Sequence, residues 1–336
     1  MQHLQNPKAK IAIAVGTTVL SLIGAKKYFA GGVNRHTPDL SGQVVIVTGG
    51  TDGIGLEAAR EFAKLGAKVI ITGRSENKAE AFIKSLPETY KVSFMKCDFA
   101  DLQNVKKFAE KILEQEEKID ILVNNAGLNS PEFKKSAQDL EFTIAVNHFA
   151  PVYLTSLLLP LLQKAEKARV INVASLAHRR ATLDFDEIFQ RDCPTGYNWL
   201  TTYGNTKMAN VIFTRKLAKE LIRKEIENVK TASLHPGAVL SGFSAPIEKS
   251  YTLAKVAAKV LYPLLMIVFK NNREGAQTTL HCSLMPWEKL ESGEYYADCK
   301  VTKTTELGYN EEKIDECWTR TNQIIKNRMS LGEDIF

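Results

Sequence analysis

The chain has 336 residues, of which 44% are hydrophobic and 24% charged, the composition of an ordinary folded protein. Its net charge of +6 is concentrated at one end, because residues 1–38 contain five basic and no acidic side chains. The rest of the chain carries 39 basic and 38 acidic residues. This near-neutral body argues against a nucleic-acid-binding face, so no nucleic-acid partner is expected.

The five cysteines are odd in number and widely spaced, and they contain no C-x-x-C pair. This spacing indicates free thiols in a reducing compartment and excludes a disulfide framework. The histidines, cysteines and aspartates also lack the spacing of metal ligands, so no metal is predicted.

The first predicted element is an apolar N-terminal segment. Residues 11–25 carry no charge and lie between Lys10 and Lys26. As a helix they would be about 22 Å long, and flanking lysines that reach the headgroups would let them span a thin bilayer. We predict that residues 1–38 form a retained anchor in the mitochondrial inner membrane or the endoplasmic reticulum. A cleaved targeting peptide and a surface helix are the alternatives.

From residue 39 onward, short apolar runs alternate with segments of helical periodicity. The predicted strands are Val44–Thr48, Lys68–Thr72, Val92–Cys97, Ile119–Asn124, Arg169–Ala174 and Val229–Leu234. Strands that are apolar on both faces and alternate with helices are typical of a parallel sheet covered on both sides. We predict an α/β fold, a Rossmann-type doubly wound sheet of about seven strands, as one domain over 39–336 with a substrate lid near 240–272.

A glycine-rich turn follows the first predicted strand. Residues 48–55 read TGGTDGIG and are followed by a helical pattern. Glycines at this place let backbone N–H groups approach a pyrophosphate at the helix N-terminus. The spacing G-x-x-x-G-x-G is also compatible with a plain turn, but its position between a strand and a helix favours a dinucleotide site.

The residue after the second strand bears on which nucleotide binds. NAD enzymes usually place an acidic residue there to bind the ribose 2′-hydroxyl, whereas this chain has Arg74. A guanidinium suits a 2′-phosphate, so NADPH/NADP+ is expected and NADH is the less favoured cofactor; a solvated arginine in a turn is the alternative. Asp98, after the third strand, is expected either to accept from the adenine amino group or to cap a helix.

Tyr203 and Lys207 are four residues apart in a helical segment, so they share one face. A phenol is a poor proton donor and acceptor at neutral pH, and a neighbouring ammonium brings its pKa into range. The pair therefore suggests acid–base chemistry, although such pairs also arise by chance on amphipathic helices.

Together these motifs resemble the short-chain dehydrogenase/reductase family, and within it the retinol dehydrogenase-like branch. The motifs stand in family order: TGGTDGIG, Asp98, NNAG at 124–127, Asn147 in VNHF, Ser175 in NVASLAH, Tyr203 with Lys207, and His235-Pro236-Gly237. The branch is indicated by Asp184-Phe185-Asp186, by Glu274-Gly275-Ala276-Gln277, by the segment 292–299 and by residues 26–32. The resemblance covers residues 26–325.

The resemblance implies a role for each matched residue. Tyr203 would exchange a proton with the substrate oxygen, Lys207 would tune Tyr203 and hold the nicotinamide ribose, and Ser175 would hydrogen-bond the carbonyl oxygen. Asn147 would anchor a water of the proton relay and completes the expected catalytic set. Cofactor contacts are implied for Gly49, Thr51, Asp52, Gly53, Ile54, Gly55, Arg74, Asp98, Asn125, Ala126, Gly127, Tyr203, Lys207, Pro236, Gly237, Val239 and Ser241.

Some residues depart from the family or carry a second interpretation. Asp52 places a carboxyl near the phosphates, and Asn129 stands where relatives carry an apolar residue. His148 and His235 are interpreted as hydrogen-bonded structural residues, and His178 as a structural residue or one that lines the substrate entrance. The apolar stretch 253–269 is expected to be a buried lid or a second membrane contact.

The resemblance implies an NADP(H)-dependent oxidoreductase that interconverts a lipophilic, retinoid-like alcohol and its aldehyde or ketone. A nucleotide-binding scaffold or accessory subunit of a membrane complex is the alternative. The intact set of Asn147, Ser175, Tyr203 and Lys207 favours the enzyme. The expected partners are a lipophilic small molecule and the membrane, and association with further copies or with complex subunits is left open.

Overall fold

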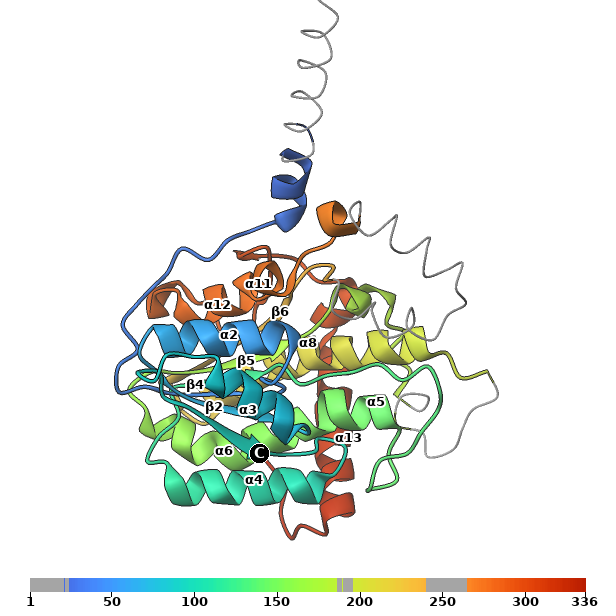
Figure 1. Ribbon diagram of the computed structural model, residues 1–336. Coiled ribbons are helices and arrows are strands. Elements are labelled where there is room, and N and C mark those ends of the chain that lie inside the picture. Colours follow the sequence, from blue (N-terminus) through green and yellow to red (C-terminus); the bar gives the residue numbers. More distant parts are fainter. Residues whose placement is uncertain (1–20, 22–23, 186–188, 190–195, 240–264) are drawn as a thin grey trace, which may run out of the picture.

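The computed structural model describes residues 21, 24–185, 189, 196–239 and 265–336 (Figure 1). Within these residues eight strands form one sheet in the order β3-β2-β1-β4-β5-β6-β7-β8. All neighbouring strands are parallel except the pair β7 and β8. The strands are β1 (Val44–Val47), β2 (Lys68–Gly73), β3 (Val92–Lys96), β4 (Ile121–Asn124), β5 (Ala168–Val173), β6 (Val229–His235), β7 (Tyr295–Ala297) and β8 (Lys300–Val301).

The doubly wound fold predicted from the alternating pattern is confirmed. Each of the six predicted strands is present, with boundaries within two residues of those expected. Strand β1 pairs with β2 on one side and with β4 on the other, so the chain reverses its direction of winding at β1. In doubly wound sheets, ligands bind at the carboxyl ends of the strands at such a reversal.

Helices and helical turns cover both faces of the sheet (Figure 1). They are α2 (Gly53–Lys64), α3 (Glu76–Lys84), α4 (Leu102–Gln115), α5 (Phe142–Ile144), η2 (Ala145–Phe149), α6 (Ala150–Lys164), η3 (Leu176–Arg180), α8 (Trp199–Arg223), α11 (Asn272–Gly275), α12 (Gln277–Leu284), η5 (Trp287–Lys289), η6 (Glu306–Tyr309) and α13 (Glu311–Met329).

Alternate residues of each strand enter two separate cores. In β1, Val45 and Val47 pack into the cluster beneath α2, α3 and α12, whereas Val44 and Ile46 pack into the cluster beneath α4, α6 and α8. All four side chains are buried. A strand covered on both faces has no polar side, which explains why the central strands read as continuous apolar runs.

One helical stretch of the described residues, Phe142–Lys164, is long and apolar enough to cross a membrane. It is 83% buried inside the fold and packs against α4, so it is a core helix. The anchor predicted at 11–25 lies almost entirely outside the described residues, as does most of the apolar stretch 253–269.

The segment that leads from the tail into the domain is held by specific contacts. Residues 24–30 are helical, and Lys26 Nζ lies 2.6 Å from Glu274 and 3.0 Å from the carbonyl oxygen of Phe269. Figure 1 shows residues 24–30 beside the short helix 265–268. Residues 24–30 therefore lie beside the start of α11 and the residues just before it.

Candidate active site

The motifs singled out in the sequence meet at one edge of the sheet. The glycine-rich turn follows β1, Arg74 follows β2, residues 125–127 follow β4, Ser175 lies two residues after β5, and Pro236 follows β6. These strands are parallel, so their carboxyl ends lie at the same edge. The topology thus gathers residues that are far apart in the sequence at one end of the sheet.

The glycine-rich turn and the loop after β4 are joined by hydrogen bonds. Thr48 Oγ1 accepts from the N–H groups of Asn125 and Ala126, each at 2.9 Å, and Asn125 Nδ2 donates to Thr48 O at 2.8 Å. An added Cβ on Gly55 would lie 2.4 Å from Asn125 Nδ2 and 2.5 Å from Gly49 O. Only a glycine lets helix α2 begin this close to the loop that follows β4.

The carboxyl of Asp52 has a cationic partner. Asp52 accepts from the Gly53 N–H as the N-cap of α2, and Lys78 Nζ of α3 lies 2.5 Å from its Oδ2. The hydrogen bond from Lys78 lowers the pKa of Asp52. The pair is exposed and contributes little to stability. Its effect is local, because Lys78 offsets the negative charge that the sequence places in the turn.

Arg74 and Asp98 follow the neighbouring strands β2 and β3 at their carboxyl ends. The Arg74 side chain is exposed and forms no ion pair or hydrogen bond with the residues that the structure describes. Asp98 accepts from the Ala100 N–H at 3.0 Å, and helix α4 is capped by Asp101. The structure therefore does not support the helix-cap interpretation of Asp98.

Tyr203 and Ser175 are brought together by close packing of α8 against η3. Burial raises the pKa of Tyr203, and the nearby Ser175 side chain lowers it. A Cβ on Gly204 would lie 2.8 Å from Ala177 O, so the glycine after Tyr203 permits the approach. The packing of α8 against η3 thus brings Tyr203 close to the turn that follows Ser175.

Lys207 lies behind Tyr203 on the same helix. Its Nζ is 5.7 Å from the centre of the Tyr203 ring and donates to Val173 O at 2.9 Å. The residue is buried, and burial lowers its pKa to about 8. It is therefore still charged at pH 7, and a cation at this distance favours the phenolate form of Tyr203.

Asn147 lies in the π-helical turn η2, and its side chain is hydrogen-bonded to the loop that follows β4. Its Oδ1 accepts from the Leu128 N–H at 2.8 Å, and its Nδ2 donates to Leu128 O at 2.7 Å and to Thr206 Oγ1 at 3.1 Å. A Cβ on Gly127 would lie 3.1 Å from Lys207 Nζ and 3.3 Å from Asn147 Oδ1. Asn147, Gly127 and Lys207 are therefore neighbours, and the four expected catalytic residues belong to one site.

The remaining expected cofactor contacts lie after β6. Gly237 N donates to His235 Nδ1 at 2.9 Å, which gives His235 a structural role in the turn. Val239 approaches Ile54 of α2, because a Cβ on Gly275 would lie within 3.0 Å of both side chains. The segment after β6 therefore reaches the start of α2 through the Glu274–Gln277 motif. Ser241 lies outside the described residues.

His178 lies behind Ser175 and does not face solvent. It is fully buried, its Nδ1 lies 2.7 Å from Ser175 O, and the Tyr295 hydroxyl lies 3.3 Å from the same nitrogen. Burial lowers its pKa. These contacts favour the structural interpretation over a place at the substrate entrance.

Two positioning features were not predicted from the sequence. The Thr48 hydroxyl orders the loop after β4, and Gly204 allows η3 to approach α8. The sequence signal for Gly204 was its place directly after Tyr203 on a helix, where a glycine is costly without a packing reason. In the described part of the chain, no group of three His, Cys, Asp or Glu side chains could hold a metal. The described cysteines, Cys97, Cys282, Cys299 and Cys317, are free thiols, and Cys193 lies outside the described residues.

Comparison with known proteins agrees with this geometry. A family profile described as short chain dehydrogenase matches residues 43–185. Retinol dehydrogenase 12 of Bos taurus is 37% identical, covering 89% of this chain and 92% of its own length. Retinol dehydrogenase 11 of Homo sapiens is 33% identical, covering 87% and 89%. The fold alone is shared with L-sorbose reductase from Gluconobacter frateurii, with a TM-score of 0.60, 24% identity and coverage of 79% and 98%. The chain belongs to the short-chain dehydrogenase family, in its retinol dehydrogenase-like branch.

Proposed function

We propose that this protein is an NADP(H)-dependent oxidoreductase that interconverts a lipophilic, retinoid-like alcohol and its aldehyde or ketone. The observation that carries the proposal is the position of Tyr203 on α8, which packs against the turn that begins after Ser175, with the Lys207 cation 5.7 Å from the phenol ring. This arrangement lies at the same sheet edge as the glycine-rich turn. A proton donor beside a dinucleotide site is what carbonyl reduction requires of a protein.

Residues at the carboxyl ends of the strands would each bind a different part of the cofactor. The N-terminus of α2 and the turn at 49–55 would hold the pyrophosphate, and Lys207 would hold the ribose next to the nicotinamide. The bound cofactor supplies the hydride. Val239 lies near Ile54 at the start of α2. Together with Pro236 and Gly237, it would border the nicotinamide ring.

The protein's own groups would move the proton. Ser175 would donate a hydrogen bond to the substrate carbonyl oxygen and hold it beside the Tyr203 hydroxyl. Tyr203 would then give its proton to that oxygen in reduction, or take a proton from it in oxidation. Lys207 would stabilise the phenolate that remains after proton donation, because it is buried and cationic at pH 7.

The preference for NADPH rests on Arg74. Its exposed guanidinium follows β2 and has no partner among the described residues, so it is free to bind a phosphate. Lys78 pairs with Asp52, which limits repulsion between that carboxylate and a 2′-phosphate.

Two partly exposed leucines support a lipophilic substrate. Leu176 follows Ser175, Leu200 lies one turn before Tyr203, and they are 49% and 41% exposed. The retinoid-like class is supported by the two retinol dehydrogenases at 33–37% identity.

Attachment to a membrane through the N-terminus is part of the proposal. Support comes from the uncharged run 11–25 and its flanking lysines. Tyr28 and Phe29, which follow it, are 81% and 41% exposed, as expected for aromatic residues at a membrane interface. The contact of Lys26 with Glu274 would hold the domain close to that interface.

The experiment is turnover of a panel of aldehydes and ketones, first with NADPH and then with NADH. Tyr203→Phe should leave NADPH binding nearly intact and lower kcat by roughly 10²–10⁴, as for removal of a general acid. Lys207→Ala should weaken both, because it removes a ribose contact and a charge. Tyr90→Phe is the matched control, since it removes a phenol just before β3, at the opposite edge of the sheet. Wild-type turnover by Tyr203→Phe would refute the assignment.

A further inference from the structure

The backbone carbonyl of Asn147 has a partner that a regular helix cannot provide. In an α-helix this carbonyl would accept from the N–H of residue 151, but that residue is Pro151, which has none. The helix widens into a π-helical turn at Ala145–Phe149. Asn210 Nδ2, from α8, donates to the Asn147 carbonyl oxygen at 2.8 Å. A side chain from another helix thus replaces the missing backbone donor.

Asn210 is itself held by a buried chain of hydrogen bonds. Its Oδ1 lies 3.2 Å from His148 Nδ1, and His148 Nε2 lies 2.9 Å from Thr321 Oγ1 on α13. A carbonyl oxygen only accepts, so Asn210 must present its amide nitrogen to Asn147 and its oxygen to His148. His148 Nδ1 therefore donates, and Nε2 accepts from the Thr321 hydroxyl. In each of these three hydrogen bonds, the donor is the group farther from Asn147 and the acceptor is the group nearer to it.

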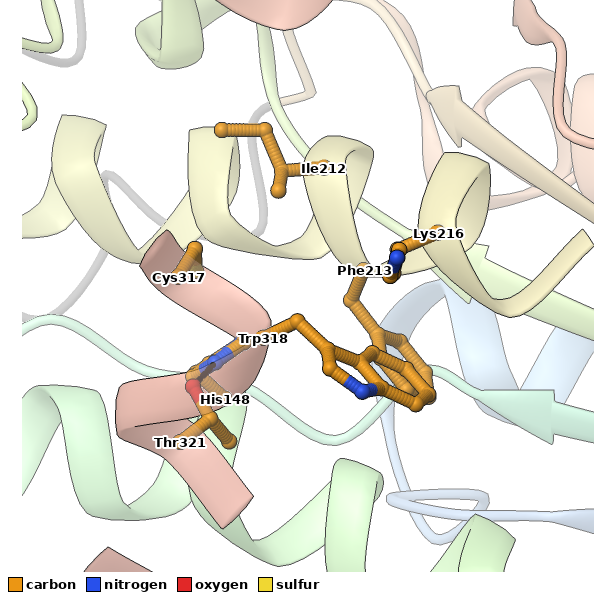
Figure 2. A pocket seen from close by; sticks show the side chains of 7 residues that line it. All are labelled: His148, Ile212, Phe213, Lys216, Cys317, Trp318 and Thr321. Carbon is orange, nitrogen blue, oxygen red and sulfur yellow. Dashed lines mark hydrogen bonds between the residues drawn. The ribbon is translucent and has the colours of Figure 1, made fainter. Parts of the chain in front are cut away.

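Water has little access to these hydrogen bonds. His148, Asn210 and Thr321 are at most 5% exposed. Figure 2 shows His148 and Thr321 lining a small pocket together with apolar side chains, among them Phe213 and Trp318. Hydrogen bonds surrounded by apolar groups are stronger than the same bonds in water, and an unpaired member is costly. The orientation of Asn210 is therefore well defined.

This series of hydrogen bonds ends at Asn147, in the candidate active site. Through its amide, Asn147 holds both the backbone of Leu128 and the hydroxyl of Thr206, which is next to Lys207. We propose that Asn210 is a positioning residue for Asn147, and that His148 and Thr321 of helix α13 hold it in the orientation that donates to the Asn147 carbonyl. The consequence for catalysis rests on the proposed function, but the consequence for geometry does not.

Three sets of variants separate positioning from general stability. Asn210→Asp keeps the size of the side chain and the acceptor for His148, but removes the donor to Asn147. Thr321→Val removes the hydroxyl that is hydrogen-bonded to His148 Nε2, whereas Thr321→Ser keeps a hydroxyl at this position. Asn322→Ala is the matched control, because Asn322 is also buried on α13 and its Nδ2 donates within the same helix, to Trp318 O.

Each variant is measured in two ways, with the full-length protein. The first is carbonyl reduction, resolved into kcat and KM, with NADPH affinity from calorimetry. We expect Asn210→Asp to lower kcat by about 10- to 100-fold, since displacement by about 1 Å can cost 10²-fold, with NADPH affinity within about threefold. Thr321→Val should lower kcat less, and Thr321→Ser and Asn322→Ala should keep the wild-type value.

The second measurement is hydrogen exchange at the Leu128 amide, whose N–H donates to Asn147 Oδ1. We expect exchange at least about tenfold faster in Asn210→Asp than in the wild type or Asn322→Ala. Unchanged exchange in Asn210→Asp, with or without loss of turnover, overturns the proposal. If the wild type reduces no carbonyl compound, the proposed function fails, and the exchange measurement alone still decides the positioning role. If Asn210→Asp does not fold, the Thr321→Val and Thr321→Ser pair decides it by the same two measurements.

Discussion

Replacement of Arg74 by alanine tests the cofactor preference with little risk to the fold. The side chain is exposed, follows the last residue of β2, and forms no ion pair or hydrogen bond with any described residue. Its removal therefore breaks no interaction of the free protein, and the free energy of unfolding should change by less than about 0.5 kcal/mol. Any loss of NADPH affinity then reports on a contact made only with the nucleotide.

The magnitude follows from the position of the charge. Two unit charges 4 Å apart interact by about 1 kcal/mol in bulk water and about 4 kcal/mol near a protein surface. A charge-assisted hydrogen bond to phosphate, net of desolvation, contributes about 1.5–3 kcal/mol. We expect Arg74→Ala to weaken NADPH binding by this amount, about 10- to 150-fold in Kd. NADH lacks the 2′-phosphate, so its Kd should change by less than about twofold.

Calorimetric titration of both nucleotides into both proteins is the assay. Lys91→Ala is the matched control, because Lys91 is an exposed cation before β3, at the opposite edge of the sheet, and its loss changes the net charge equally. The control should bind NADPH like the wild type at 0.15 M salt, where charges more than about 8 Å apart are screened. Equal affinity of the wild type for NADPH and NADH would refute the reasoning.

Three further predictions concern pH and the membrane. Burial lowers the pKa of Lys207 to about 8, so kcat for carbonyl reduction should fall as the pH rises through about 8 and the cation is lost; a profile that is flat to pH 10 would contradict this. Burial also lowers the pKa of His148 from 6.5 to about 4, so the unfolded chain takes up this proton first as the pH falls. The associated stability is fully present above pH 6.5, and about 3 kcal/mol of it should be lost by pH 4, a loss absent from His148→Gln in denaturant titrations. Alkaline carbonate should leave the full-length chain with the membranes, whereas a chain that begins at Asn34 should be soluble; release of the intact protein would argue against the anchor.

Much of the fold was predictable because its signals are local. Apolar runs with helices between them indicate buried parallel strands, and they matched β1 to β6 within two residues. The sheet has seven strands in the parallel order and, beyond them, a two-residue antiparallel strand β8. Lys300 and Val301 of this strand are exposed, so no periodic apolar pattern reveals it. The helix-cap alternative for Asp98 also failed, because Asp101 stands at the N-terminus of α4.

By itself, the sequence determined which residues share a turn of helix or follow a strand. Tyr203 and Lys207 lie on one face of α8 because a turn of α-helix contains 3.6 residues. The glycine-rich turn directly follows β1 because the apolar run of that strand ends just before it. Only the tertiary structure decided contacts between distant segments: Lys78 with Asp52, Lys26 with Glu274, and the chain from Thr321 through His148 and Asn210 to Asn147. Periodicity repeats over a few residues and places a side chain only on a face of its own element. Partners across elements depend on how the sheet and its helices are stacked, and helix α13 packs against α8 although 87 residues separate the end of α8 from the start of α13.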